Sequence, residues 1–354
     1  MRSDYKVSFI IPFHDVLVEQ LLECIESVLS QGISRYEVLL IDDGSTNQDL
    51  IKECQNASKT NKNIRYLRQD NLGAAAARNK GLDEADGDWI VFVDADDKLR
   101  RSFLSKVSKH LYSDVDLIIF DYNLWDRKKY KRKTLKKNLN LEKDRKDILA
   151  NIMFYPGKMN DFMFGSIWAK CFSRSFLKKN SIRFADQLRK AQDRRFMADV
   201  FSAVNRVSYS PSIMYYYRIN ERSITHRLDW SMEEYYKRLS NSFEKFCKEN
   251  KVDFWISKFL NYSIFLELLP LTVCHADADL RYEEKRLVYK RMYKFFGIRN
   301  ESRRIRYKDV PSFRGKVKLM FIRGRLFWPV YIIFRTKSRM EEQSIFKDEG
   351  DKRC

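Results

Sequence analysis

The sequence predicts an α/β fold with a Rossmann-like, mostly parallel sheet flanked by helices and a helical, basic C-terminal extension. In the first 123 residues, short apolar runs alternate with segments whose apolar residues recur every three or four positions. After about residue 230 only the helical pattern remains. Near-continuous apolar strands separated by helices are typical of a parallel sheet that is covered on both faces.

The elements follow in a regular order. The expected strands are residues 7–12, which a proline ends, 36–41, 64–67, 89–93 and 114–122. The expected helices are residues 17–31, a helix that opens at Gly44-Ser45-Thr46, and residues 74–85. The basic run 126–146 has little apolar content, so we expect a surface loop or an exposed helix there. Ligands of such sheets bind at the carboxyl ends of the strands.

Composition narrows the class of protein. With 354 residues, 44% of them hydrophobic and 33% charged, the chain is globular rather than disordered. The net charge of +20 is uneven: residues 1–123 hold 15 basic against 21 acidic side chains, and residues 281–354 hold 22 against 9. The basic C-terminal part favours phosphates or anionic membranes as partners.

Cysteines and apolar runs suggest a cellular compartment. The six cysteines are scattered without a CxxC pair, which argues against a structural zinc site and a disulfide framework. No apolar segment follows the N-terminus, and no run reaches the roughly 18 apolar residues of a spanning helix. We therefore expect a cytoplasmic protein without a secretory signal.

Acidic residues gather at the ends of the predicted strands. Asp42 and Asp43 follow the second strand, and Asp94 and Asp96 follow the fourth. Carboxylates brought together repel one another unless a cation or hydrogen-bond donors neutralise them. Oxygen ligands without clustered Cys or His favour magnesium or manganese over zinc. Capping of a helix is an alternative for Asp43, but it does not explain Asp94-Ala95-Asp96.

Four ordered segments resemble glycosyltransferase family 2: VSFIIPFHD, EVLLIDDGSTNQD, NLGAAAARNKGLDEADGDWIVFVDADD and AQDRRF. The resemblance covers residues 6 to about 225 and implies an inverting enzyme with an A-type nucleotide-sugar-binding fold. It implies a catalytic domain over residues 1–225, with a nucleotide-sugar half (1–123) and an acceptor half (124–225). Residues 226–354 would form a helical C-terminal region.

The resemblance also implies donor-binding residues. Pro12 and Phe13 would line the nucleotide base, and Asp42 or Asp43 would accept a hydrogen bond from the base or hold the ribose. Arg78 would approach the diphosphate, because its guanidinium offers a rigid fork of donors; a salt bridge is the alternative. Arg218 resembles a family position near the phosphates, with pairing in the core or at the surface as the alternative.

Metal ligands follow from the same comparison. Asp96 would bind manganese or magnesium directly, as part of a DxD-type motif, and Asp94 would reach the ribose or the metal. His226 is a candidate third ligand, with a solvent-exposed histidine as the alternative.

Asp193 is the expected catalytic base. The family usually shows Glu-Asp at this point, and this sequence has Gln192-Asp193. The substitution keeps the second acid and removes a neighbouring charge. A surface pair with Arg194 or Arg195 is the alternative for Asp193. Trp168 and Lys170 resemble the family's stretch beside the acceptor, although a buried aromatic is equally compatible with Trp168.

The tail 316–339 mixes aromatic and aliphatic residues with basic ones, and Pro329 is expected to break it into two short pieces. This pattern suits the interface of an anionic inner membrane leaflet; packing against the rest of the protein is the alternative.

These residues together predict transfer of a sugar from a UDP-sugar to a hydroxyl of a glycan or lipid-linked glycan, for bacterial capsule, lipooligosaccharide or other surface polysaccharide. A polyprenyl-phosphate sugar synthase is the near alternative. An oxidoreductase would need a GxGxxG turn after the first strand, and a nucleic-acid-binding module would need a recognisable motif; the sequence has neither. A basic module that binds membranes without catalysis stays open.

Overall fold

The computed structural model describes residues 5–31, 35–110, 114–125, 130–135, 139–153, 162–219, 231–252, 254–275, 278–310 and 312–344. His226 lies outside these residues. The chain forms two compact units, one of residues 1–148 with 161–219 and the other of residues 149–160 with 220–354. The assignment of a separate task to each part of the chain stays a prediction.

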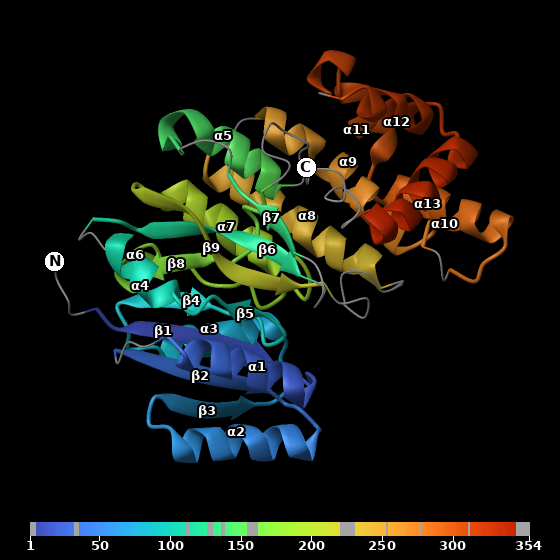
Figure 1. Cartoon of the computed structure of the whole chain (residues 1–354). Helices are drawn as coiled ribbons and strands as arrows, with labels where there is room; N and C mark the ends of the chain where they lie inside the picture. Colours follow the sequence, from blue (N-terminus) through green and yellow to red (C-terminus); the bar gives the residue numbers. More distant parts are fainter. Residues whose placement is uncertain are drawn as a thin grey trace, which may run out of the picture. The chain divides into compact units, whose positions relative to one another are not determined.

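The first unit is built on one sheet, whose strands lie in the order β3-β2-β1-β4-β8-β6-β9-β5, with β7 beside β6 (Figure 1). The strands are β1 Val7–Phe13, β2 Tyr36–Asp43, β3 Ile64–Gln69, β4 Trp89–Phe92, β5 Lys98–Leu99, β6 Leu117–Trp125, β7 Tyr130–Lys133, β8 Lys170–Ser173 and β9 Val207–Arg218. The helices that accompany them are α1 Val18–Leu29, α2 Gln48–Thr60, α3 Ala74–Glu84, α4 Phe103–Val107, α6 Arg174–Lys179 and α7 Gln192–Ala203, with a 3-10 turn at Ser108–His110. Helix α5, Leu141–Ile152, continues from this unit into the second.

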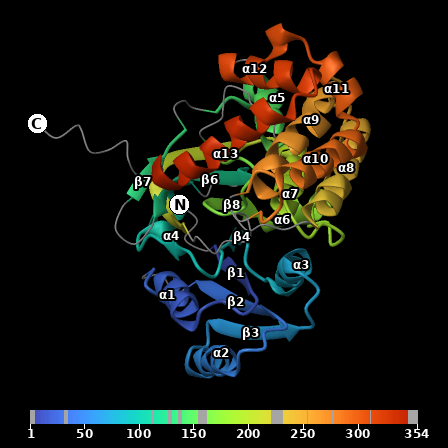
Figure 2. The same cartoon turned by 90° about the vertical axis from the view of Figure 1, so that its right-hand side faces the viewer.

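The sheet is parallel in its first half and mixed in its second. Strands β3, β2, β1 and β4 pair in parallel, as the apolar runs predict. Strand β8 is antiparallel to both of its neighbours, β4 and β6. Strand β5 pairs antiparallel with β9, and β7 pairs antiparallel with β6. Figure 2 shows α1 and α3 on opposite faces of the β1–β2 region, which explains why these strands are buried along almost their whole length.

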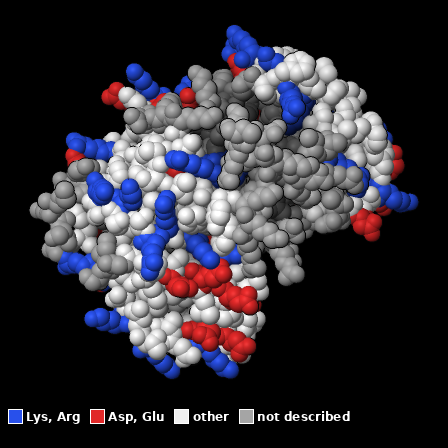
Figure 3. Space-filling view, in the orientation of Figure 1, with Lys and Arg blue, Asp and Glu red and all other residues white. Residues whose placement is uncertain are grey.

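The register of the strands places the expected site residues at one edge. Phe13 at the end of β1 pairs with Asp42 near the end of β2, and β4 ends beside Ile10 of β1. The Asp94–Asp97 loop therefore leaves the sheet next to the ends of β1 and β2. Figure 3 shows acidic side chains gathered over α1 and α2, with basic side chains above them near β4 and β5.

The second unit consists of helices around α9. Its helices are α8 Met232–Glu249, α9 Phe254–Leu271, α10 Tyr282–Phe295, α11 Ile298–Arg304, α12 Phe313–Arg323 and α13 Phe327–Ser344, with a 3-10 turn at Tyr307–Asp309. Helix α9 packs against α8, α10, α11 and α13, and buries Phe259, Leu260, Ile264, Phe265, Leu268 and Leu269. None of the helices in the described part of the chain combines the length and the apolar character needed to cross a membrane.

Three local expectations need correction. Strand β1 does not stop at Pro12; it continues to Phe13, because β4 pairs with β1 only as far as Ile10 and Pro12 lies beyond that ladder. The basic run 126–146 contains strand β7, which pairs with β6, and the start of α5.

Pro329 does not break the tail. It lies in the first turn of α13, where a missing N–H removes no helical hydrogen bond, and the break falls at 324–326 instead.

Candidate active site

The loop Asp94–Asp97 is held by strand β9. The hydroxyl of Tyr215 accepts a hydrogen bond from the Asp94 N–H (3.1 Å) and donates one to Asp97 Oδ2 (2.7 Å). Asp97 is fully buried and also accepts from the backbone N–H of Arg218 (2.7 Å). Burial, followed by the charges of Asp96 and Asp94, raises the pKa of Asp97 well above its usual value. Asp97 is thus the anchor of the loop, and Asp94 and Asp96 are its partly exposed members.

Arg218 ties this loop to the first helix. Its Nε donates to the carbonyl of Asp96 (2.7 Å) and its Nη2 to Glu23 on α1 (2.6 Å). The buried guanidinium lies 4.3 Å from the ring centroid of Trp125, a cation–π contact. Its Nη1 has no hydrogen-bond partner among the described residues, and the expected contact of Arg218 with the donor's phosphates stays a prediction beside the pairing alternative.

Arg78 brings the expected metal-binding loop and the expected base together. From α3, its Nη2 donates to Asp94 Oδ1 (3.2 Å) and its Nη1 to Asp193 Oδ1 (3.0 Å), a residue 115 positions away in the sequence. Arg78 is only 8% exposed, whereas Asp94 and Asp193 are 28% and 27% exposed at their side chains. The guanidinium is thereby engaged by the protein's own carboxylates, and its contact with a donor diphosphate stays a prediction.

Asp193 lies in the first turn of α7, after Ala191 in the left-handed conformation (φ 53°). Burial raises the pKa of Asp193, while the nearby cations, Arg78 above all, act in the opposite direction. When its amide is oriented to satisfy both groups, Gln192 accepts from Arg78 Nη1 (2.8 Å) and donates to the carbonyl of Leu188. Gln192 therefore supports Arg78 without competing with Asp193 for its positive charge.

Lys170, on β8, is a buried cation close to Asp193. Its Nζ donates to Ser166 Oγ (3.1 Å) and to the carbonyl of Met163 (3.3 Å). Burial lowers the pKa of Lys170 to about 7, against the opposing attraction of Asp193. The side chain is only 1% exposed, and its expected contact with the acceptor stays a prediction.

Trp168 forms part of an aromatic cluster. Its ring stacks on Tyr215 and Tyr217, each at 5.1 Å between centroids, and meets the edge of Tyr122 at 4.7 Å. The residue is buried. The expected stacking of Trp168 on a sugar is therefore corrected: neighbouring rings already occupy the faces of the indole.

Asp42 and Asp43 bind the protein's own loops. Asp42 is fully buried and accepts hydrogen bonds from Ser45 N, the Tyr66 hydroxyl and Arg68 Nη1. Asp43 accepts from Gln69 Nε2 (2.8 Å), Leu72 N (2.9 Å) and Gly73 N (2.9 Å).

These bonds use most of the acceptor capacity of the two carboxylates, and their expected contact with the donor nucleotide stays a prediction. Pro12 is half-buried and Phe13 buried at the adjacent end of β1.

The carboxylates of Asp94 and Asp96 suit a hard divalent cation. Within the described residues no group of three or more His, Cys, Asp and Glu side chains is arranged to hold a metal. Magnesium and manganese need no such cage, because one or two protein carboxylates are completed by water and substrate phosphates. Two partly exposed aspartates in one loop fit that chemistry.

Three residues of this region were missed by sequence reasoning: Glu23, Tyr215 and Tyr217. Burial raises the pKa of Tyr217 most, and the charges of four carboxylates raise it further: those of Asp97, Asp94, Asp96 and Asp193. One phenol thus lies close to all four acids. The Tyr215-Tyr216-Tyr217 run was the available signal, since alternate residues of a strand share a face; nothing in the sequence marked Glu23.

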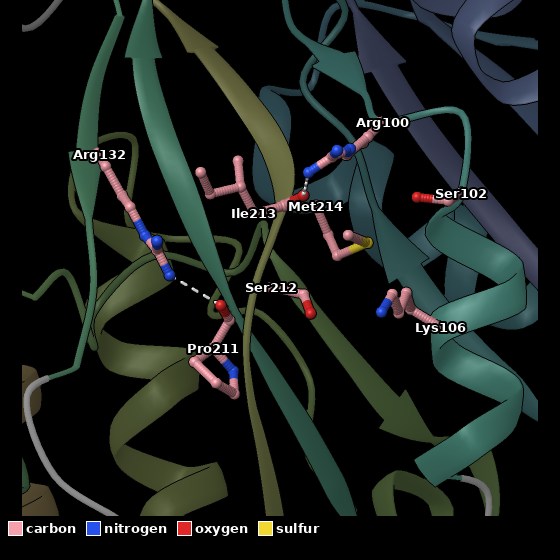
Figure 4. A pocket seen from close by; sticks show the side chains of 8 residues that line it. All are labelled: Arg100, Ser102, Lys106, Arg132, Pro211, Ser212, Ile213 and Met214. Atoms are coloured by element: carbon pink, nitrogen blue, oxygen red, sulfur yellow. Dashed lines mark hydrogen bonds between the residues drawn. The ribbon is translucent and has the colours of Figure 1, made fainter.

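A separate cavity of about 270 Å³ lies at the edge of the first unit (Figure 4). Its lining includes Arg100, Ser102, Lys106, Arg132, Ser212 and Met214, and none of the expected site residues. In Figure 4, Arg132 donates to the carbonyl of Pro211 on β9. This cavity is basic and distinct from the aspartate loop.

Comparison with known proteins gives the family. The model described as glycosyl transferase family 2 matches residues 8–182. Residues 8–182 of this chain, just under half of its length, form a glycosyltransferase family 2 domain. The relatives include the putative glycosyltransferase EpsH of Bacillus subtilis (26% identity; 64% of this chain, 65% of EpsH). The cholesterol galactosyltransferase of Borreliella burgdorferi is 30% identical over 60% of this chain and 59% of its own length. The matches therefore span less than two thirds of these relatives.

A solved structure supports the fold. S. aureus TarS 1–349, crystallised in complex with UDP-GlcNAc, superposes with a TM-score of 0.56 at 18% identity, over 95% of this chain and 92% of TarS. At that identity the likeness concerns the fold alone. It confirms the predicted α/β fold with a sheet flanked by helices.

Proposed function

We propose that the protein is an inverting glycosyltransferase that moves a sugar from a nucleotide-sugar, a UDP-sugar in the first instance, to a hydroxyl of a glycan or lipid-linked glycan. The observation that carries this proposal is the bridge from Asp94 through Arg78 to Asp193. It joins the DxD-type loop after β4 to a partly exposed carboxylate on α7. The family 2 domain and the fold shared with TarS support the same conclusion.

The residues suggest the course of the reaction. The acceptor oxygen attacks the anomeric carbon as the bond to the leaving diphosphate breaks, and attack from the opposite face inverts that carbon. The acceptor proton must leave as its oxygen bonds to carbon, and Asp193 is placed to take it. A carboxylate whose pKa burial has raised is a better base near neutral pH than an ordinary aspartate.

Arg78 and Lys170 would set the state of that base. Arg78 fixes Asp193 Oδ1, which leaves Oδ2 for the acceptor hydroxyl. When Lys170 is protonated, its charge favours the ionised form of Asp193. Both residues are positioning residues, since neither is assigned to the reacting atoms.

Asp96 and Asp94 would hold manganese or magnesium together with the donor's phosphates, and the cation would neutralise charge that develops on the leaving diphosphate. Arg218 would hold the loop in place through the Asp96 carbonyl. Pro12 and Phe13 would shape the base site, with Asp42 and Asp43 fixing the adjacent loops.

The second unit would bind the protein peripherally to an anionic membrane. Side chains of the tail 316–339 divide between two environments: Leu319, Ile322, Val330 and Phe334 are buried, and Met320, Leu326, Trp328 and Ile332 are exposed. Packing within the unit and a free apolar surface therefore coexist. Basic residues beside exposed aromatic and aliphatic ones suit an anionic interface. We place the enzyme in synthesis of bacterial surface polysaccharide at the inner face of the cytoplasmic membrane.

The decisive test is Asp193→Asn. Asparagine keeps the size of the side chain but cannot act as a base, so transfer to a hydroxyl acceptor should fall about 10²–10⁴-fold. Affinity for the donor, measured by calorimetry across a panel of UDP-sugars with manganese, should change little. The matched control is Asp199→Asn on the same helix, which pairs with Arg195 and should leave transfer nearly intact.

If Asp193→Asn transfers the sugar to a hydroxyl acceptor at the wild-type rate, Asp193 is not the catalytic base. Retained transfer to polyprenyl phosphate alone would favour the alternative synthase, because a phosphate acceptor is already ionised and needs no base.

The metal assignment has its own test in Asp96→Asn. Its affinity for the best UDP-sugar in manganese should fall about tenfold or more, because a metal between carboxylate and phosphate contributes several kcal/mol. In chelator, without manganese, wild type and variant should bind alike. A difference of equal size with and without manganese would contradict the role of Asp96 as a ligand.

A further inference from the structure

The second unit contains a cavity of about 540 Å³ between α10, α11 and the turn that joins α12 to α13. Two tyrosines of α10, Tyr289 and Tyr293, contribute to its wall. Its charged lining consists of Lys290, Lys294, Arg299 and Arg325, with no acidic side chain. The volume lies within the range of small-molecule sites, about 300–1,000 Å³.

The four cations lack acidic partners among the described residues, although acids are available nearby. On the same helix, Arg286 pairs with Glu283 (3.4 Å) and Arg291 with Glu233 of α8 (2.8 Å). The acids of this region are thus engaged by cations that do not line the cavity. Like charges gathered around one hollow repel one another, and a bound anion relieves that repulsion.

Apolar surface adjoins these cations. Phe295 follows Lys294 and Leu326 follows Arg325 in the chain, and both are exposed. Trp328 at the start of α13 is 55% exposed, and its ring lies 5.6 Å from that of the exposed Tyr282 on α10. Phe295, Leu326 and Trp328 thus lie one to three positions in the chain from cations that line the cavity, so the same unit offers one surface for a negative group and one for hydrocarbon.

We propose that this cavity binds the phosphate-class, dianionic head group of an amphiphile whose apolar chain lies along the exposed side chains of α10 and α13. A phosphate monoester carries about −1.5 to −2 charges at neutral pH and so matches several unneutralised cations better than a diester does. The inference deepens the proposed membrane association and rests on it. It adds selectivity for a head group to attraction by charge alone.

The experiment compares vesicles of phosphatidylcholine containing phosphatidic acid with vesicles containing phosphatidylglycerol at matched total charge. The full-length wild-type protein should bind the phosphatidic acid vesicles more tightly. The double variant Lys290→Gln, Lys294→Gln should lose about tenfold in affinity for them, since each basic residue contributes measurably near an anionic surface. It should retain phosphatidylglycerol binding through the tail.

The matched control is Arg100→Gln with Lys106→Gln, which removes the same charge from the lining of the cavity in the first unit. These two side chains also lack acidic partners among the described residues, so equal losses for both double variants would reduce the effect to diffuse electrostatics and overturn the proposal. The proposal would also be overturned if the wild-type protein bound both kinds of vesicle equally well.

A soluble arm separates the two sources of phosphate. Inorganic phosphate, compared with chloride at equal ionic strength, should raise the melting temperature of wild type less than the phosphatidic acid vesicles do. If free phosphate raises the melting temperature but wild type does not distinguish the two kinds of vesicle, the proposal of an amphiphilic ligand is overturned. Release of UDP from UDP-sugars should be unchanged in the Lys290, Lys294 double variant. If wild type itself fails to release UDP, the proposed enzyme fails while the vesicle comparison stays valid.

Discussion

Arg78 shows how one side chain can organise a site. Its two terminal nitrogens bind carboxylates from different elements, Asp94 after β4 and Asp193 on α7. A lysine could offer only a point charge at this place, whereas the guanidinium fork fixes the separation of both partners. The relative positions of Asp94 and Asp193 thus depend on one guanidinium.

Lys170 gives a prediction about stability. Its pKa is lowered to about 7 by burial, far below that of a lysine in an unfolded chain, about 10.4. Between these values the unfolded state binds more protons than the folded state, so the contribution of this group to stability rises with pH. Lys170→Met should remove a slope of at most about 1.4 kcal/mol per pH unit for the single proton.

Chemical denaturation at pH 7, 8 and 9 measures this slope. Lys179→Met, at an exposed position on α6, is the control and should follow wild type. Parallel stability curves for wild type and Lys170→Met would show that Lys170 stays charged when folded.

The sequence predicted which acidic residues belong to the candidate site better than it predicted which side chains contact them. Asp94, Asp96 and Asp193 were named from their motifs, and the structure brings Asp94 and Asp193 to one guanidinium. The contacts that Trp168 and Asp42 make with Tyr215 and Tyr66 were not predicted, because these partners lie far away in the sequence or in another element. A motif states residue type and spacing, not what packs against it.

At the scale of elements, the turn after β2 positions helix α3. Asp43 accepts hydrogen bonds from Leu72 N and Gly73 N, and Gly73 immediately precedes the helix that carries Arg78. Gly44, with φ of +76°, lies so close to this loop that a Cβ there would be 2.8 Å from Asn71 N. The end of one strand thereby sets the start of the next helix.

We therefore expect Gly44→Ala to destabilise the protein by more than the 1–2 kcal/mol or so that a left-handed backbone costs a non-glycine residue, because the clash adds to it. Gly324→Ala is the matched control: its Cβ would meet Leu326 at 3.4 Å, an ordinary contact, and its φ of −72° suits alanine. Thermal unfolding compares the two variants. A melting temperature of Gly44→Ala equal to wild type would disprove the role of this turn.

Elements with a strong pattern were predicted and weak ones were not. Strands β1, β2, β3 and β4 are apolar runs and lie where expected. Strand β7 (Tyr130–Lys133) is a basic segment with no strand pattern and exists because β6 offers it an edge. Two-residue β5 likewise depends on β9. Pairing with a partner, not local propensity, decides such strands.

At the scale of the whole molecule, the net charge of +20 yields a prediction about membranes. Binding to phosphatidylglycerol vesicles should weaken steeply as salt rises from 0.1 to 1 M, because the Debye length shrinks from about 10 to about 3 Å. Binding that remains at high salt should fall further in Trp328→Ala, which removes exposed aromatic surface. Co-sedimentation with vesicles measures both effects.

Neutral phosphatidylcholine vesicles are the control and should show no dependence on salt. Absence of binding to anionic vesicles even at low salt would exclude membrane association through this surface.

The sequence by itself determined the α/β class, the family and the identity of the acids, because buried strands, amphipathic helices and motifs are written in local spacing. Only the tertiary structure decided that Arg78 joins Asp94 to Asp193, that Asp42 and Trp168 are enclosed, and that cations without an acidic partner among the described residues line a cavity in the second unit. The physical reason is that burial and charge pairing arise between segments distant in the chain, and local sequence does not encode which of them meet.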